Sequence, residues 1–238
     1  GAAPGRVEFS RGTSTFGVNR RLADGKGSVT MAPNPDGPID RDLDTLWLRT
    51  DGGDLLGTLT IYACHPTSLS GYQVGPDYPG FLCKHVKTDT GAPALFSTGC
   101  AGDVRPWFKK EGATGFLRPS LQELESAGAR MAREVLSSRL GAVPIESDRL
   151  QVNHVFHRLP YQELPTREEL LCETDSDDPR ARDWSAAMLR RLDSGGLADA
   201  CPHEVQVLQL NPDFRIVFLG GEVLSEIGLH IKQYLAPA

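Results

Sequence analysis

The sequence predicts an α/β protein in which a mixed β-sheet is interleaved with helices. Three observations lead to this prediction. Two pairs of apolar or β-branched segments are each joined by a turn, two longer segments open with a capping box, and no regular βαβ repetition runs through the chain. Antiparallel hairpins that alternate with helices are typical of a mixed sheet.

Two hairpins supply most of the expected strands. The expected strand pairs are 45–49 with 57–63, and 205–210 with 215–219. The strand at 57–63 is almost entirely apolar toward its end, which is typical of a central strand, and it leads into Cys64 and His65. The last strand ends at two glycines followed by Glu222.

Single strands and helices complete the expected pattern. Strands are expected at 94–97 and 149–159, and helices at 120–140, at 166–194 with a break near Pro179, and at 224–234. Ser120 and Glu123 form the capping box of the first helix. Residues 5–40 are rich in Gly, Pro, Asn and Asp, which predicts irregular, turn-dominated backbone.

Length and composition restrict the class of protein. The chain has 238 residues, a formal net charge of -6 and a pI near 5.5. We expect one domain over 1–238. Nucleic acid is excluded as a partner, because phosphate binding requires a basic face. No run of about 18 apolar residues is present, so no transmembrane segment is expected.

The five cysteines form no recognisable framework. Their number is odd, their spacing is irregular and no CxxC occurs. Neither a set of disulfides nor a four-cysteine zinc site is therefore expected. Cys64 directly precedes His65, but neighbouring residues on a strand point to opposite faces, which excludes a thiol–imidazole pair.

Three polar loops at 64–68, 98–106 and 220–222 follow the ends of apolar strands, where functional sites usually lie. His65 is a candidate metal ligand, although a histidine hydrogen-bonded in the core is the commoner case. Glu222 is a candidate ligand or base, and it is equally well explained as a residue that caps the following helix.

Four further residues have a structural explanation beside a functional one. Asp103 and Arg105 are expected to form an ion pair that fixes their loop. Asp77 lies beside Pro and Gly, as turn residues do. Arg20 has the fork geometry to bind an anionic or carbonyl group, but a solvated arginine is more common.

Six segments of the chain resemble the neutral ceramidase family (neutral/alkaline, non-lysosomal), and especially its shorter bacterial members. The segments are 16–21, 34–40, 62–67, 77–80, 99–103 and 221–222. They occur in the order that the family has and cover nearly the whole chain. The resemblance implies part of a catalytic domain that hydrolyses the amide bond of an N-acylated, amphiphilic lipid such as ceramide.

The resemblance also implies site residues and a cofactor. His65 and Glu222 would be ligands of a zinc ion (Zn²⁺), and Arg20 would stabilise the oxyanion near the scissile amide. Asp77 and Asp103 would orient ligands or substrate. A zinc-activated water would carry out the hydrolysis. A secreted or periplasmic location is also implied by the resemblance.

Two departures from the family pattern qualify this expectation. Arg105 occupies the place of a serine in the family's Gly-Asp-Val-Ser-Pro loop, which removes a candidate nucleophile. The family takes one zinc histidine from before this chain's first residue and a zinc tyrosine from after its last. The chain is therefore expected to be an internal part of a longer parent protein, and to be inactive when isolated. An amidase with another N-acyl substrate and a non-catalytic binding protein remain the alternatives.

Overall fold

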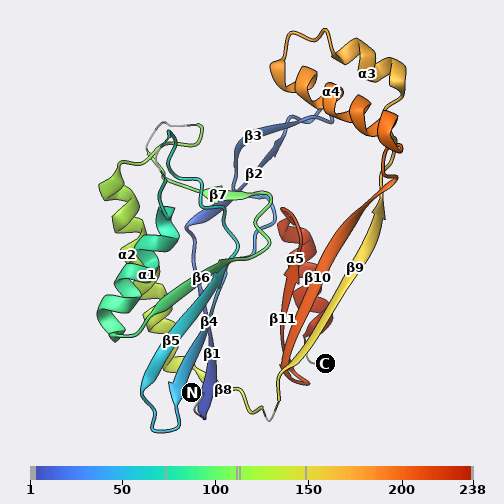
Figure 1. The fold of residues 1–238 in the computed structure, drawn as a ribbon. Coiled ribbons are helices and arrows are strands. Elements are labelled where there is room, and N and C mark those ends of the chain that lie inside the picture. Colours follow the sequence, from blue (N-terminus) through green and yellow to red (C-terminus); the bar gives the residue numbers. More distant parts are fainter. Residues whose placement is uncertain (1–3, 73, 111, 113, 148, 237–238) are drawn as a thin grey trace. The chain divides into compact units, whose positions relative to one another are not determined.

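The computed structural model describes residues 4–72, 74–110, 112, 114–147 and 149–236 (Figure 1). Contacts between residues divide the chain into two compact units. The first unit comprises 1–151, 209–215 and 222–238, and the second comprises 152–208 and 216–221. The single domain expected over 1–238 stays a prediction.

A five-stranded mixed sheet is the centre of the first unit. Its order is β6-β5-β4-β1-β8. The strands are β1 (Gly5–Thr13), β4 (Asp42–Thr50), β5 (Leu55–Tyr62), β6 (Ala94–Thr98) and β8 (Val143–Pro144). β5 pairs with β6 in parallel, and β1, β4, β5 and β8 pair antiparallel. The predicted α/β class with a mixed sheet is therefore confirmed.

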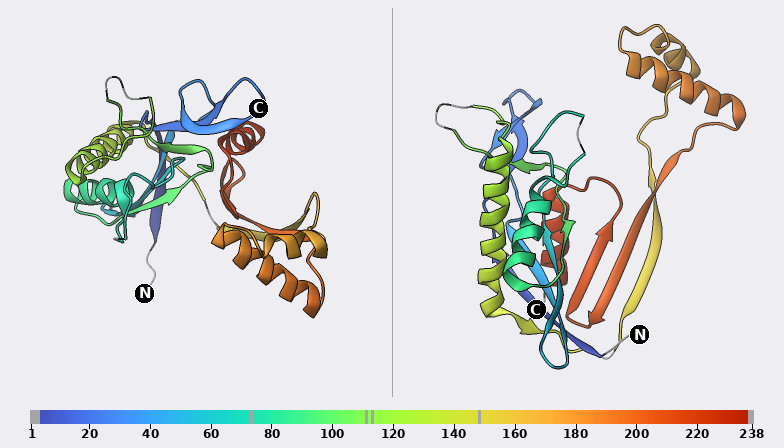
Figure 2. Two further views of the ribbon diagram at one scale, coloured as in Figure 1. Left: turned by 90° about the horizontal axis from the view of Figure 1, so that it is seen from above. Right: turned by 60° about the vertical axis from the view of Figure 1, so that its left-hand side comes forward.

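Helices α1 (Asp77–Thr90) and α2 (Leu121–Ser138) pack side by side on one face of this sheet (Figures 1 and 2). They and the sheet enclose the hydrophobic core. Its largest fully buried side chains include Phe16, Leu43, Trp47, Tyr62, Tyr78, Leu82, Leu124 and Met131. A short 3-10 turn, η1 (Arg139–Gly141), connects α2 to β8. The core fixes the ends of β5 and β6, from which two of the polar loops emerge.

A second, three-stranded sheet lies in the same unit. Its order is β3-β2-β7, with β2 (Gly17–Ala23), β3 (Val29–Asn34) and β7 (Val104–Pro106). β2 pairs antiparallel with both neighbours, and its register is irregular between Asn19 and Arg21. Helix α5 (Ser225–Leu235) completes the unit.

The second unit consists of long strands and a pair of helices. Strands β9 (Gln151–Pro160), β10 (Ala200–Asn211) and β11 (Phe214–Leu219) form a sheet of order β11-β10-β9. Helices α3 (Arg167–Glu173) and α4 (Pro179–Ser194) pack on each other between β9 and β10 in the chain (Figure 1). No helix among the described residues is long and apolar enough to cross a membrane.

Most of the predicted elements are confirmed. Both hairpins, the strands at 94–97 and 149–159, and the helices at 120–140 and 224–234 correspond to observed elements. The helical stretch at 166–194 is divided into α3 and α4, which begins at Pro179.

Two expectations were wrong. The irregular backbone predicted for 5–40 is instead three strands. Turn-forming residues occupy 24–28, between β2 and β3, and 35–40, after β3, but the strands themselves also contain Gly5, Gly12, Gly17 and Pro33. Helix α1 was missed, since Pro79 and Gly80 are poor helix formers. Both lie in its first turn, where proline is tolerated.

Candidate active site

The loop 99–104, which follows β6 and includes the first residue of β7, connects the three segments that carry Arg20, His65 and Glu222. The backbone N–H of Arg20 donates to the carbonyl of Asp103 at 2.7 Å, and that of His65 donates to the carbonyl of Val104 at 3.1 Å. The N–H of Gly102 donates to the carbonyl of Val223 at 2.8 Å. All three segments are therefore positioned by main-chain bonds to one short loop.

Gly102 allows this loop to touch the backbone beside Glu222. A Cβ atom at position 102 would lie 2.3 Å from the carbonyl oxygen of Glu222, which is far inside van der Waals contact. The atom it would meet belongs to the backbone and cannot rotate away. Only glycine allows this approach of the two segments.

Asp103 attaches the same loop to helix α5. Its Oδ1 accepts hydrogen bonds from the backbone N–H and the hydroxyl of Ser225, each at 2.8 Å, and its Oδ2 accepts from Asn19 Nδ2 at 3.0 Å. Leu224, at the N-cap of α5, has no side chain that can cap the helix. Asp103, which is only 3% exposed, supplies the missing acceptor and places its negative charge at the helix N-terminus.

Arg20, His65 and Glu222 meet in space although they lie far apart in the sequence. Nε2 of His65 is 3.5 Å from Oε2 of Glu222, and Nη2 of Arg20 is 3.6 Å from the same oxygen. The guanidinium of Arg20 also donates to the carbonyl of Gly102 at 2.7 Å. The side chains of His65 and Arg20 are 15% and 21% exposed and that of Glu222 is 71% exposed, so the cluster opens to solvent on the glutamate side.

His65 and Glu222 fit two positions of a zinc site. Nε2 of His65 is buried and has no hydrogen-bond partner in the described part of the chain, so this nitrogen remains available to a metal. Two donors about 2.1 Å from a tetrahedral zinc ion lie roughly 3.4 Å from each other. The observed separation of 3.5 Å agrees with this geometry. The described residues contain no group of three or more His, Cys, Asp or Glu that could hold a metal. Ligation by His65 and Glu222 stays a prediction.

Asp77 fixes the loop that follows His65. Its Oδ2 accepts from the backbone N–H groups of Ser68 at 2.9 Å and Leu69 at 3.2 Å, and its Oδ1 accepts from its neighbour Tyr78 at 2.7 Å. Asp77 has a φ of 50°, in the left-handed region. It is the first residue of α1 and not a turn residue. The geometry gives it a positioning role.

Cys64 belongs to the core. Its side chain is fully buried, and burial raises the pKa of the thiol well above 9.0. The Tyr78 hydroxyl donates to the Cys64 carbonyl at 2.6 Å and fixes the backbone just before His65. A thiolate nucleophile at this position is therefore disfavoured, in agreement with the sequence-based exclusion.

The ion pair expected between Arg105 and Asp103 is not formed. The carboxylate of Asp103 bonds to Asn19 and Ser225. The guanidinium of Arg105 instead donates to the Thr67 carbonyl at 3.1 Å and lies 4.7 Å from the centre of the Phe116 ring. Asp103 precedes β7 and its carboxylate is occupied by Asn19 and Ser225, whereas Arg105 lies within the strand and bonds to Thr67.

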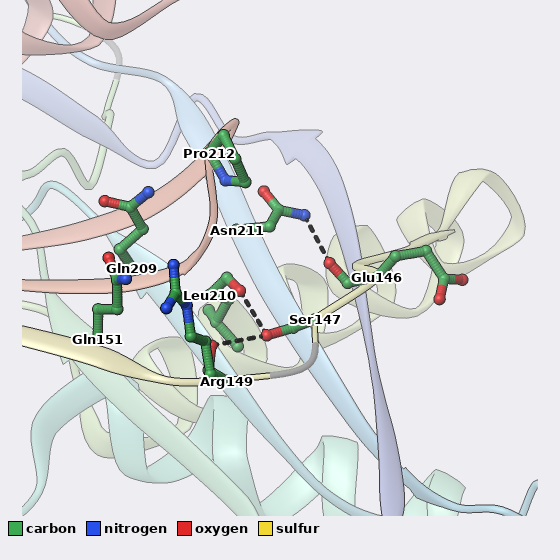
Figure 3. Close-up of a pocket in the computed structure, with 8 residues that line it drawn as sticks. All are labelled: Glu146, Ser147, Arg149, Gln151, Gln209, Leu210, Asn211 and Pro212. Atoms are coloured by element: carbon green, nitrogen blue, oxygen red, sulfur yellow. Dashed lines mark hydrogen bonds between the residues drawn. The ribbon is translucent and has the colours of Figure 1, made fainter.

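A pocket of about 550 Å³ lies elsewhere in the first unit, where Glu146, Ser147, Arg149 and Gln151 meet the turn between β10 and β11 (Figure 3). Its lining includes Glu146, Arg149, Gln151 and Gln209 and contains none of the candidate site residues. The Ser147 hydroxyl and the Asn211 amide form hydrogen bonds to main-chain carbonyls in its wall. These polar groups hold the two segments together, and we assign the pocket no catalytic role.

Sequence reasoning did not identify Ser225 and Thr67 as parts of the site. Ser225 follows a leucine at the start of a helix, and a helix start without its own capping side chain indicates an acceptor from elsewhere in the chain. No local pattern identifies Thr67, whose contribution is a backbone carbonyl.

Comparison with known proteins relates this fold to ceramidase. No protein-family model and no curated protein sequence matches the chain. Neutral ceramidase from Pseudomonas aeruginosa superposes with a TM-score of 0.62 at 18% identity, covering 97% of this chain and 42% of that one. A ceramidase complexed with C2 gives 0.62 at 15% identity, covering 97% and 44%. The chain thus has the fold of part of ceramidase, which confirms the resemblance at the level of the fold, and it spans less than half the length of those proteins.

Proposed function

We propose that the chain contributes part of the active site of a zinc-dependent hydrolase that cleaves the amide bond of an N-acylated lipid such as ceramide. The observation that carries the proposal is the convergence of His65, Glu222 and Arg20, with the unpartnered Nε2 of His65 directed to the Glu222 carboxylate. The likeness of the fold to ceramidase supports the same reaction class.

Each residue has a role in this proposal. His65 and Glu222 would hold the zinc ion, which would supply Lewis-acid polarisation of the amide carbonyl and activation of a water molecule. Arg20, held by the Gly102 carbonyl, directs a fixed positive charge toward the developing oxyanion. Asp103 and Asp77 position the segments of Glu222 and His65.

Zinc content and turnover of the parent protein test the proposal. We expect His65→Ala and Glu222→Gln each to lower zinc occupancy and to reduce fatty-acid release from N-acyl amides, beginning with a fluorescent ceramide analogue. The loss should exceed the 10- to 100-fold that removal of a supporting residue typically causes. His154→Ala is the control, because His154 is exposed and hydrogen-bonded to Glu204.

Full zinc occupancy in both variants after dialysis would contradict the ligand assignment. Zinc and substrate binding without fatty-acid release would support the alternative of a binding protein. Release of fatty acid from other N-acyl amides, but not from the ceramide analogue, would support an amidase with a different substrate.

A further inference from the structure

The guanidinium of Arg105 has three contacts, but none of those among the described residues neutralises its charge. Nη2 donates to the Thr67 carbonyl at 3.1 Å, and Nη1 lies 3.7 Å from the Met31 sulfur, a weak acceptor. The Phe116 ring covers one face, with its centre 4.7 Å from Cζ. Of five guanidinium N–H donors, these contacts occupy one strongly and one weakly. Three N–H donors therefore have no partner among the described residues, and two of them are on the Nη atoms.

Partial burial makes this unpaired charge unfavourable. Arg105 is half-buried, and its Nε is buried without a hydrogen-bond partner in the part of the chain that the structure describes. No carboxylate forms an ion pair with it within the described residues. A cation that has lost part of its hydration is normally compensated by an acid. Arg20, by comparison, has Glu222 within 3.6 Å.

Arg105 lies beside the candidate active site. It is the second residue of β7, whose first residue, Val104, accepts the N–H of His65. Its guanidinium bonds to the carbonyl of Thr67, two residues after His65. The bonds of both Nη atoms lie at the surface, so a ligand can reach this end of the side chain.

We propose that Arg105 binds an oxyanion of the substrate, a carboxylate or a phosphate, and that the preferred substrate is therefore an anionic N-acyl amide. This inference rests on the proposed function and favours its alternative substrate class, because ceramide carries no anion. Guanidinium binds such groups through paired N–H donors, and the Phe116 and Thr67 contacts fix the orientation of the fork in advance.

A matched set of N-lauroyl amides in the zinc-loaded parent protein tests the inference. N-lauroylglycine carries a carboxylate, N-lauroyl phosphoethanolamine carries a phosphate, and N-lauroylglycinamide is neutral. We measure kcat/KM for each compound, together with Kd by calorimetry. Arg105→Gln should lower kcat/KM and affinity for the preferred anionic compound roughly 10- to 100-fold. For the neutral compound, the same two quantities should change less than about threefold.

Two further variants control for fold and for general charge. Arg105→Lys keeps the positive charge and should retain part of the preference for the anion, even if Arg105→Gln destabilises the loop. Arg130→Gln removes an exposed arginine from α2 and should leave kcat/KM and affinity unchanged for the anionic and the neutral compounds.

The outcomes separate this inference from the proposed function. Amide hydrolysis with no anion preference, or with a preference that survives Arg105→Gln, would overturn the inference and leave the hydrolase standing. Anion binding that depends on Arg105 without hydrolysis would support the inference and reject the hydrolase. Failure of both anionic compounds to bind would overturn the inference.

Discussion

At the residue scale, Asp77 combines an unfavourable backbone conformation with three hydrogen bonds. Its φ of 50° is the only positive value of a non-glycine residue among those described. Such a conformation costs about 1–3 kcal/mol unless the surroundings stabilise it. The bonds to Ser68, Leu69 and Tyr78 provide that stabilisation and at the same time order the loop after His65.

We expect Asp77→Ala to lower the free energy of unfolding by roughly 2–4 kcal/mol, because three N–H groups lose a charged acceptor and alanine disfavours positive φ. Asp77→Asn should cost about half as much, since asparagine tolerates this backbone and keeps an acceptor. Urea denaturation measures both, and exposed Asp89→Ala is the control, with an expected change within about 0.5 kcal/mol. Equal losses in the two Asp77 variants would show that the acceptor is unimportant.

Only part of the candidate site was accessible from sequence at this scale. His65, Glu222 and Arg20 came from the resemblance, and the structure brings them together. The partner of Asp103 could not be predicted, because Ser225 lies 122 residues away and no local pattern records such a contact. For the same reason, the nearest acid in the sequence was wrongly assigned as the partner of Arg105.

At the element scale, helix α5 is attached to strand β4 and the residues before it by a lysine surrounded by acids. Nζ of Lys232 lies 2.7 Å from Asp40, 2.8 Å from Asp42 and 3.3 Å from Asp44. Burial alone would lower the pKa of this ammonium, but the charge of Asp44 and the bonds to Asp40 and Asp42 raise the pKa above its usual 10.5. With Asp103 at its other end, α5 is fixed at both termini.

Lys232→Met should reduce the free energy of unfolding by about 1–3 kcal/mol at pH 7, because it leaves these carboxylates with less positive charge. A raised lysine pKa means that the stabilisation is fully present below pH 10.5 and is lost as the pH rises through the higher folded-state value. The difference from the unmodified protein should therefore shrink above that pH.

Denaturation of both proteins between pH 7 and 11.5 measures this convergence, and Lys26→Met, in an exposed turn, controls for loss of a lysine. A difference that stays constant across this pH range would argue that Lys232 acts through packing alone.

Elements were predicted where local chemistry determines them. The capping box of Ser120 and Glu123, together with the apolar residues at helical spacing after it, predicted a helix at 120–140. The observed helix α2 is Leu121–Ser138, so the predicted ends differ by one or two residues. Helix α1 carried a similar signal, since Tyr78, Leu82 and Val86 recur at intervals of four and are all buried. Pro79 and Gly80 obscured that signal, although both lie within the first turn.

At the scale of the whole molecule, the order of the six resembling segments predicted the fold, and the structure confirmed it at 18% identity or less. The division into two compact units was not anticipated. Strands β9, β10 and β11 run through three of the four boundaries, and only the fourth, after Gly220 and Gly221, coincides with glycines. Composition alone therefore does not indicate it.

The 238-residue chain alone should bind zinc weakly and should not hydrolyse a ceramide-like amide. A catalytic zinc normally has three protein ligands, and the described residues bring together two candidates, His65 and Glu222. Metal analysis after dialysis measures retention, and the same chain with His65→Ala identifies zinc bound elsewhere. One zinc per chain that depends on His65, together with turnover, would show that this chain holds a complete site.

The contact of Gly102 with the carbonyl of Glu222 has a consequence for how this site can change over evolutionary time. The bonds that join Arg20, His65 and the Glu222 segment to the loop 99–104 run from main chain to main chain, so they do not depend on which side chains surround them. Positions that contribute only main-chain bonds can change their side chains while the relative placement of the three residues persists, whereas Asp103 also acts through its carboxylate. Position 102 has no such freedom, because any side chain there separates the loop from the glutamate.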